Sequence, residues 1–107
     1  MKTTDMNDQI VELVVYKVKQ GLAGNFTQDI LPKFQQLVKS FGGVVSYQTY
    51  GSVGKSGLYV DSITWDSAGS AKGAAAKFDE LKTQGKHTEL MDFFEEVILM
   101  DHFKPIS

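Results

Sequence analysis

GLYVDSITWDSAGSAKGAAAKF, residues 57–78, is the stretch of this sequence that decides the fold. Its first part is rich in β-branched and aromatic residues and predicts a strand over Leu58–Trp65. Ser67 or Ser70 then provides a helix N-cap. Small and apolar residues follow at helical spacing, so we expect a helix that packs closely on its neighbours. The inward face of this helix is predicted to hold Ala71, Ala74, Ala75, Phe78 and Leu81.

Upstream of this stretch the pattern predicts a strand, a helix and a second strand. The strand covers residues 10–19 and the helix residues 26–41, with Asn25 as its N-cap. Pro32 should either kink this helix or begin its regular part after an irregular first turn. The pair Gly42-Gly43 ends the helix, and the next strand covers residues 44–50.

Downstream, a Gly-rich hairpin loop at residues 52–57 precedes the Leu58–Trp65 strand, and Gly85 ends the helix that follows it. We expect a short helix over residues 87–96 and a last strand over residues 97–103. The short helix should turn Leu90, Phe93 and Phe94 inward.

The order of these elements is βαββαβ, which predicts a ferredoxin-like α+β fold. Such a fold has a four-stranded antiparallel sheet with the helices on one face. The 107 residues suffice for one domain, which we place at residues 9–107 after a disordered lead at residues 1–8.

Composition excludes several classes of function. The net charge of −2, with no cluster of basic residues, argues against binding to nucleic acid. The absence of Cys excludes disulfides and thiolate chemistry, and two separated His residues give no metal signature. No apolar run approaches the roughly 18 residues of a membrane span. The start lacks an apolar leader segment, so we expect a cytoplasmic protein without a membrane partner.

The sheet face away from the helices is predicted to be apolar and uncovered, and an uncovered apolar face needs a partner. A second copy of the chain is the simplest cover and would give a two-fold homodimer. By strict alternation this outer face holds Val11, Leu13, Val15, Leu58, Val60, Ile98 and Met100.

Three segments resemble a known group: VELVVYKVKQG, FGGVVSYQTYG and LYVDSITWDSAGSAKGAAAKF. Together they are similar to the dimeric α+β barrel superfamily, in particular to its antibiotic-biosynthesis-monooxygenase-like domains. The resemblance covers about residues 10–104 and implies a dimeric barrel of ferredoxin-like subunits. Members of the group include cofactor-independent oxygenases, haem-degrading enzymes and isomerases.

The resemblance also places the residues that serve haem in the haem-degrading branch. Their positions correspond here to Val14, Ala74 and Gln84, and all three depart from the residues of that branch. We therefore expect no cofactor, and haem in particular is not expected. His87, three residues after Gln84, leaves a shifted axial ligand as the alternative. Quinol-oxidising members often carry a His inside the second helix, and none stands there before His87.

Carboxylates in the strands are the candidates for chemistry. Alternation places Glu12, Asp61 and Asp101 under the helices, where burial of a charge is costly and raises the pKa of a carboxyl group. Asp61 and Glu12 are the predicted catalytic bases. Substrate binding is predicted for Tyr16, Tyr59, Trp65, Asp101 and Phe103.

The structural alternative is that these carboxylates lie at strand ends and face water, and a register slip of one residue would invert the assignment. His102 alternates oppositely to Asp101, so we expect it on the dimer face or its rim. His87 starts a helix in a polar loop and is interpreted as a solvated residue.

Two hypotheses of function remain. The first is a cofactor-independent monooxygenase that acts on a phenolic or quinol-like substrate. In it, Trp65, Tyr16 and Tyr59 enclose the ring, and Asp61 or Glu12 removes a phenolic proton. The second is a non-enzymatic dimeric module that binds an apolar ligand or another protein. A cavity with an acid or base within reach would favour the enzyme.

Overall fold

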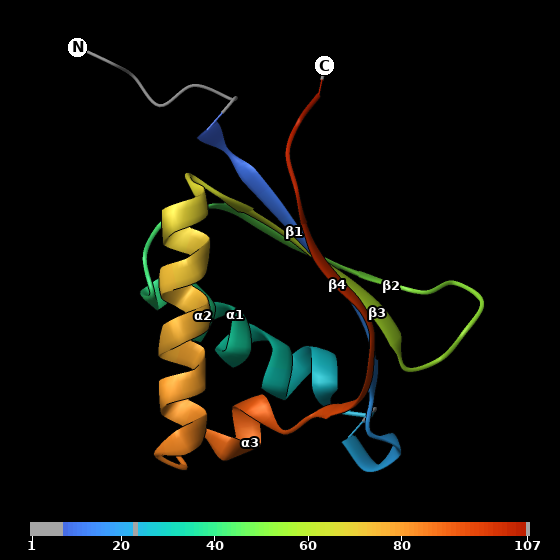
Figure 1. Cartoon of the computed structure of the whole chain (residues 1–107). Coiled ribbons are helices and arrows are strands. Elements are labelled where there is room, and N and C mark those ends of the chain that lie inside the picture. Colours follow the sequence, from blue (N-terminus) through green and yellow to red (C-terminus); the bar gives the residue numbers. More distant parts are fainter. Residues whose placement is uncertain (1–7, 23, 107) are drawn as a thin grey trace.

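The computed structural model describes residues 8–22 and 24–106, so the predicted lead lies outside the described residues except for Asp8. Four strands and three α-helices make up most of it (Figure 1). The strands are β1 (Ile10–Val18), β2 (Val44–Gly51), β3 (Leu58–Trp65) and β4 (Phe94–Phe103). The helices are α1 (Leu31–Ser40), α2 (Ala68–Thr83) and α3 (Thr88–Met91), with the short turns η2 (Gln20–Leu22) and η3 (Phe26–Ile30) ahead of α1.

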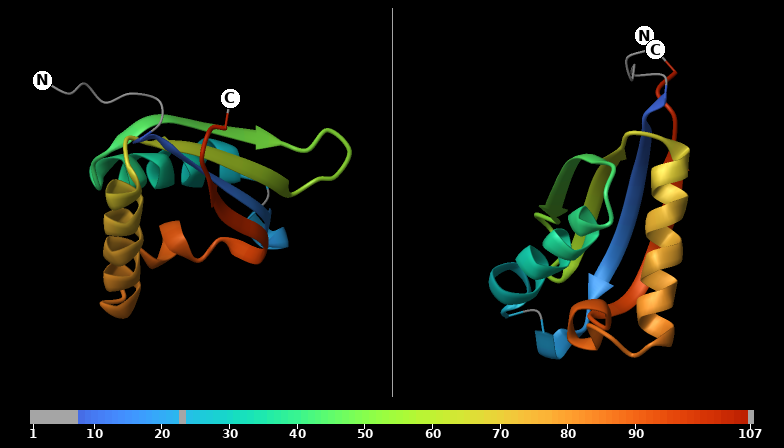
Figure 2. Two further views of the ribbon diagram at one scale, coloured as in Figure 1. Left: turned by 45° about the horizontal axis from the view of Figure 1, so that its top comes forward. Right: turned by 90° about the vertical axis from the view of Figure 1, so that its left-hand side faces the viewer.

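The strands form one antiparallel sheet in the order β2-β3-β1-β4. The helices lie on one side of this sheet, as the left view of Figure 2 shows. This arrangement confirms the predicted ferredoxin-like α+β fold. The hairpin loop between β2 and β3 projects at the end of the molecule away from α2 (Figures 1 and 2).

The start of the first helix follows one of the two outcomes expected for Pro32. Residues Phe26–Ile30 form a single π-type turn, and the regular helix α1 begins at Leu31 with Pro32 in its first turn. Proline fits there because the first amides of a helix have no partner within the helix. Asn25 occupies the N-cap position of the π-type turn, as predicted, but its side chain makes no capping hydrogen bond.

Helix α2 begins with the cap that the sequence predicts. The Ser67 side chain accepts a hydrogen bond from the Ser70 amide at 3.1 Å. The inner face of α2 holds fewer buried residues than expected: Ala71 and Ala74 are buried, Phe78 is half-buried, and Ala75 is exposed. Small side chains at these positions leave room between α2 and the sheet.

The predicted helix over residues 87–96 is wrong. Only α3 is helical, and β4 begins three residues earlier than expected, at Phe94. Tertiary contacts decide this segment, because the Lys19 amide donates to the Phe93 carbonyl at 2.9 Å and Val18 pairs with Phe94. Phe93 is fully buried.

Aromatic rings fill the core between the sheet and α1. Tyr16 packs edge-on against Phe94, with ring centroids 5.0 Å apart, and Phe34 packs edge-on against Phe93 at the same distance. Phe26 contacts Phe93 as well, again at 5.0 Å. Rings of this size dominate the apolar area that a small domain buries, so this cluster anchors α1 and the start of β4 to the sheet.

The ladder between β1 and β4 corrects the predicted faces of the last strand. Val15 pairs with Leu99 and Tyr16 with Val97, so Ile98 forms a bulge that breaks strict alternation. Directly paired residues share a face of the sheet. Beyond the bulge, Val14 pairs with Met100, Leu13 with Asp101, Glu12 with His102 and Val11 with Phe103.

Met100 therefore lies on the helix side with Val14, not on the outer face as expected. Asp101 and Phe103 lie on the outer face with Leu13 and Val11, not under the helices. The bulge explains the error, since one extra residue reverses the parity of everything beyond it.

Candidate functional site

A cavity of about 330 Å³ lies between the sheet and helices α1 and α2. Its volume falls within the range of small-molecule pockets. Two of the predicted carboxylates, Glu12 and Asp61, line it together with Trp65. Asp79 and Lys82 of α2 add charged groups to an otherwise apolar wall. The apolar lining residues are Val14, Phe34, Val38, Phe41, Ile63, Ala74, Ala75, Phe78, Phe94, Val97 and Met100.

Asp61 is a buried carboxylate, only 3% exposed, and three hydroxyl groups donate to it. Tyr16 and Thr49 donate to Oδ1 at 2.9 and 2.8 Å, and Tyr47 donates to Oδ2 at 2.8 Å. Gln35 of α1 in turn donates to the Thr49 hydroxyl at 3.0 Å. Hydrogen bonds to an ionised group are stronger than neutral ones, and here they replace the water that burial removes.

The strand register explains why these donors converge. Asp61 lies in the middle of β3, which is flanked by β1 and β2. Thr49 is the residue of β2 directly paired with Asp61, while Tyr47 and Tyr16 lie two positions away on β2 and β1. Direct and diagonal neighbours on one face are within reach of each other.

Burial and hydrogen bonding act in opposite directions on the acidity of this group. Removal from water raises the pKa of Asp61, and the hydrogen bonds from Tyr47, Thr49 and Tyr16 lower it in part. The net effect is a pKa above the ordinary value of 3.8. Burial, and then the charge of Asp61, raise the pKa values of Tyr16 and Tyr47, so both stay protonated and act as donors.

Glu12 has a different environment on the same wall. The Trp65 indole Nε1 donates to its Oε1 at 3.1 Å, and His102 Nε2 lies 3.1 Å from the same oxygen. The Glu12 side chain is 13% exposed, whereas that of His102 is 41% exposed. Glu12 therefore connects the cavity to a histidine that reaches solvent.

The structure separates the remaining predicted site residues from the cavity wall. Tyr16 is fully buried and reaches the site only through its hydroxyl on Asp61. Tyr59 stacks on Tyr16 at 5.9 Å within the aromatic core. Neither residue lines the cavity. Asp101 and Phe103 lie on the outer face of the sheet, as described above.

Several residues at this site were not found from the sequence. Tyr47 and Thr49 are on the strand that pairs with the centre of β3, and their alternation was visible in residues 44–50. His102 was expected at the dimer face, but it pairs directly with Glu12 on the helix side. Met100 lines the cavity for the same reason.

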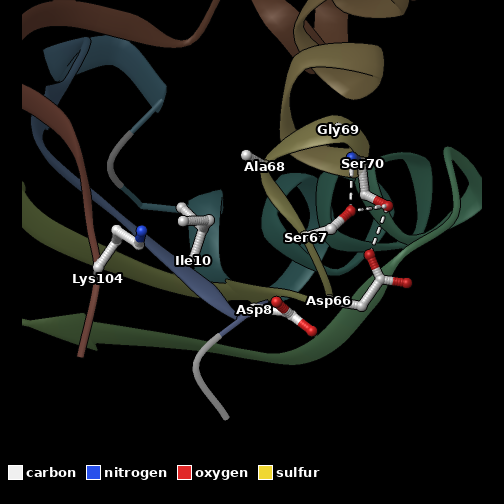
Figure 3. Close-up of a pocket in the computed structure, with 8 residues that line it drawn as sticks. All are labelled: Asp8, Ile10, Asp66, Ser67, Ala68, Gly69, Ser70 and Lys104. Atoms are coloured by element: carbon white, nitrogen blue, oxygen red, sulfur yellow. Dashed lines mark hydrogen bonds between the residues drawn. The ribbon is translucent and has the colours of Figure 1, made fainter. Parts of the chain in front are cut away.

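A second and more open pocket, of about 570 Å³, lies at the N-terminus of α2 (Figure 3). Ser67 caps the helix there, and the Ser70 hydroxyl donates to Asp66. Asp8 also lines the pocket, so two carboxylates oppose an anion that Lys104 would attract. The Ser70 amide, at the start of α2, already donates to Ser67 and is not free to bind a ligand. This pocket is therefore a weaker candidate than the cavity under the helices.

Val14, Ala74 and Gln84 occupy the positions that correspond to the haem-serving residues of the haem-degrading branch. Val14 and Ala74 line the cavity with apolar side chains, and Gln84 lies at the C-terminal end of α2. His87 is exposed and has a left-handed backbone conformation with φ of 56°. Within residues 8–22 and 24–106, no three His, Asp or Glu side chains are grouped so as to hold a metal ion.

Among the described residues, no helix is long and apolar enough to cross a membrane. This finding is consistent with the composition.

No family model matches the sequence, and no curated protein matches it. Solved structures do match the fold. A protein from Bordetella bronchiseptica assigned to the antibiotic biosynthesis monooxygenases is 16% identical, with a TM-score of 0.69 over 94% of this chain and 99% of that one. A protein from Chloroflexus aurantiacus with the same assignment is 12% identical, with a TM-score of 0.67 over 92% of this chain and 94% of that one.

SnoaB from Streptomyces nogalater, described as a cofactor-independent oxygenase, is 16% identical, with a TM-score of 0.67 over 94% of this chain and 93% of that one. At such low identities the likeness establishes the fold. The structural neighbours of this chain are antibiotic-biosynthesis-monooxygenase-like proteins of the dimeric α+β barrel type.

Proposed function

We propose that this protein is a cofactor-independent monooxygenase of a phenolic or quinol-like aromatic compound, which binds in the cavity between the sheet and helices α1 and α2. The observation that carries the proposal is the position of Glu12 and Asp61 together on one aromatic-lined wall. A plain core would hold apolar residues at both positions, because burying carboxylates is costly. The oxygenase activity of SnoaB, which has the same fold, supports the same class of reaction.

The two carboxylates have different roles in this proposal. Both oxygens of Asp61 already accept hydrogen bonds, so Asp61 is a fixed acceptor that orients a ligand hydroxyl. Glu12 is nearer to solvent and is the base that takes the phenolic proton. Trp65 and Phe34 are the rings against which the aromatic ligand packs.

The proposed reaction converts a phenol with a ring C–H opposite its hydroxyl, together with O2, into a quinone and water. Glu12 takes the O–H proton, and the phenolate passes one electron to O2. The phenoxyl radical and superoxide combine at the ring carbon, and Glu12 returns its proton to the peroxide. Loss of the C–H proton to Glu12 then breaks the O–O bond: one oxygen stays as the new carbonyl, and the other leaves as hydroxide, which takes the proton to form water.

We further propose that the active form is a homodimer joined through the outer sheet face. This face presents Leu13, Val15 and Val60 at its centre and Phe103 and Tyr50 towards its edges. Phe103 and Tyr50 are 42% and 57% exposed, and exposed aromatic residues beside an apolar sheet face are typical of an interaction surface. An obligate interface of this kind buries roughly 2,000 Å² or more.

The single tryptophan offers a direct test. Because Trp65 lines the cavity, a ligand that enters it should change the protein fluorescence. Phenols that do so, and that have a ring C–H opposite the hydroxyl, would then be incubated with the protein under isotopically labelled O2. We expect one labelled oxygen atom in the quinone product and one in water.

The matched variants are Glu12→Gln and Glu89→Gln, since Glu89 is an exposed glutamate of α3 outside the cavity. Glu12→Gln should lose most of the turnover, and Glu89→Gln should keep it. Equal turnover in Glu12→Gln would contradict the assigned base. Tight binding without any O2 consumption would favour the alternative, a dimeric ligand-binding module. The hydrogen bonds that both Asp61 oxygens accept from structural hydroxyls support this alternative.

A further inference from the structure

His102 stands out among the residues outside the predicted site because it contacts the proposed base directly. It lies on β4, opposite Glu12 in the β1–β4 register, and its Nε2 is 3.1 Å from Glu12 Oε1. Its ring is 41% exposed, so it is not a core residue held by packing. The contact joins residues 90 positions apart in the sequence.

Trp65 contacts the same oxygen, at 3.1 Å. Its indole Nε1 is a donor only, so Glu12 Oε1 must act as the acceptor of that hydrogen bond. Within residues 8–22 and 24–106, the hydrogen bonds to Glu12 fall on Oε1 alone. With both contacts on Oε1, Oε2 is the oxygen of Glu12 that can take a proton.

We propose that His102 is a positioning residue for Glu12, acting as an Nε2–H donor that holds the carboxylate with Oε2 towards the bound substrate. This inference rests on the proposed function in so far as it assigns Glu12 a reaction. The geometric part, that His102 together with Trp65 sets the orientation of Glu12, stands independently of any turnover. A base must lie within hydrogen-bond reach of the proton it takes, so loss of orientation costs rate.

The charged and titratable groups around Glu12 come from several elements. Asp61 lies on β3, Tyr47 on β2, and Asp79 and Lys82 line the same cavity from α2. None of these four is hydrogen-bonded to Glu12. His102 is thus the titratable side chain that acts on Glu12 by direct contact.

The test compares His102→Ala, which removes the donor, with His102→Gln, which restores an amide N–H at a similar distance. His87→Asn is the matched control, because His87 is the other histidine of the chain and asparagine tolerates its left-handed backbone. The first readout is the NMR signal of the indole N–H, which is a single signal because Trp65 is the only tryptophan.

We expect this indole signal to move in His102→Ala, because the freed carboxylate changes the hydrogen bond that Trp65 makes. It should return close to the wild-type position in His102→Gln and stay unchanged in His87→Asn. Nitrogen-15 spectra of the wild-type imidazole should show the proton on Nε2. An unchanged indole signal in His102→Ala, or a proton on Nδ1 alone, would overturn the proposal.

The second readout is turnover. Loss of one oriented hydrogen bond corresponds to about a tenfold fall in kcat, with KM within about twofold, for His102→Ala. His102→Gln should recover most of this loss. Failure of His102→Gln to recover it, while its indole signal is wild-type, would overturn positioning by donation. Should no variant and no wild-type protein turn over any phenol, the proposed function fails, and the indole signal still decides whether His102 orients Glu12.

Discussion

Thr49 and Asp61 are direct partners in the β2–β3 register, and the Thr49 hydroxyl donates to Asp61 Oδ1 at 2.8 Å. The Gln35 side chain holds the same hydroxyl from α1. One buried carboxylate thereby ties two strands and a helix together through uncharged donors. Within the described residues, the hydrogen-bond partners of the Asp61 carboxylate are all hydroxyl groups. Each hydroxyl therefore offsets part of the desolvation penalty of the buried charge.

Tyr47→Phe should lower the free energy of unfolding by about 1–3 kcal/mol. The substitution keeps the ring and removes the donor to Asp61 Oδ2, which leaves a buried carboxylate oxygen without its partner. Urea denaturation followed by circular dichroism measures the change. Tyr59→Phe is the control, since Tyr59 is a half-buried tyrosine of β3 whose hydroxyl does not donate to Asp61. Equal stability of the two variants would show that water takes over the role of the Tyr47 hydroxyl.

Asp61→Asn should remove a pH dependence of stability. Because the folded pKa of Asp61 is raised above 3.8, its contribution is fully present below that pH and is lost as the pH rises through the folded pKa. The wild-type protein should therefore gain stability relative to Asp61→Asn as the pH falls towards 4. Denaturant titrations of both proteins at several pH values between about 4 and 8 give the difference. A gain in the opposite direction would mean that the hydroxyls outweigh burial.

Sequence patterns predicted the fold better than the site because they report one element at a time. The alternation of β1 and β3 was sufficient to place Glu12, Asp61 and Trp65 on the helix side. Strict alternation failed on β4, because the bulge at Ile98 moves the residues after it to the opposite face of the sheet. No residue in the segment VILMDHF, residues 97–103, signals a bulge in the sequence. A single extra residue thus exchanged Asp101 for His102 in the candidate site.

Composition could not reveal the Asp61 cluster either. Tyr16 was expected to enclose a ligand ring, yet its ring belongs to the aromatic core and only its hydroxyl reaches the site. Whether a tyrosine ring faces a cavity or packs in the core depends on the helices and loops that cover it. Those contacts join segments that are distant in the sequence. The irregular turn before α1, in contrast, could be predicted from the sequence, because Pro32 is a local signal for the start of a regular helix.

Gly43→Ala should be more damaging than Gly42→Ala, although both glycines have φ of +90°. A Cβ at Gly43 would lie 2.5 Å from Ser70 Oγ, whereas nothing lies within 4 Å of one at Gly42. Backbone strain alone costs roughly 1–3 kcal/mol, and only Gly43→Ala adds a clash with the first turn of α2. Thermal unfolding of the two variants separates the effects. Equal losses would show that Ser70 moves aside without cost.

Val60→Lys should break the proposed homodimer. Val60 lies on the outer face, paired with Val15 on one side and Tyr50 on the other, so a charge there would be buried in the interface. Sedimentation at micromolar concentration should give a dimer for the wild-type protein and a monomer for the variant. The control is Val53→Lys at the exposed tip of the β2–β3 hairpin, which should remain dimeric. A wild-type monomer at that concentration would contradict the proposed interface.

This protein should bind haem only weakly. Val14 and Ala74 place only apolar side chains at two of the positions that would serve it, and His87 lies exposed beyond the end of α2. Titration with hemin should therefore give weak binding without a sharp shift of the Soret band. His87→Asn removes the histidine that follows Gln84 in the sequence and keeps the backbone conformation. Tight one-to-one binding by the wild-type protein, lost in His87→Asn, would identify His87 as an axial ligand and would point to haem chemistry in place of cofactor-independent oxygenation. The same tight binding retained in His87→Asn but lost in His102→Ala would identify His102, which contacts Glu12, as the ligand.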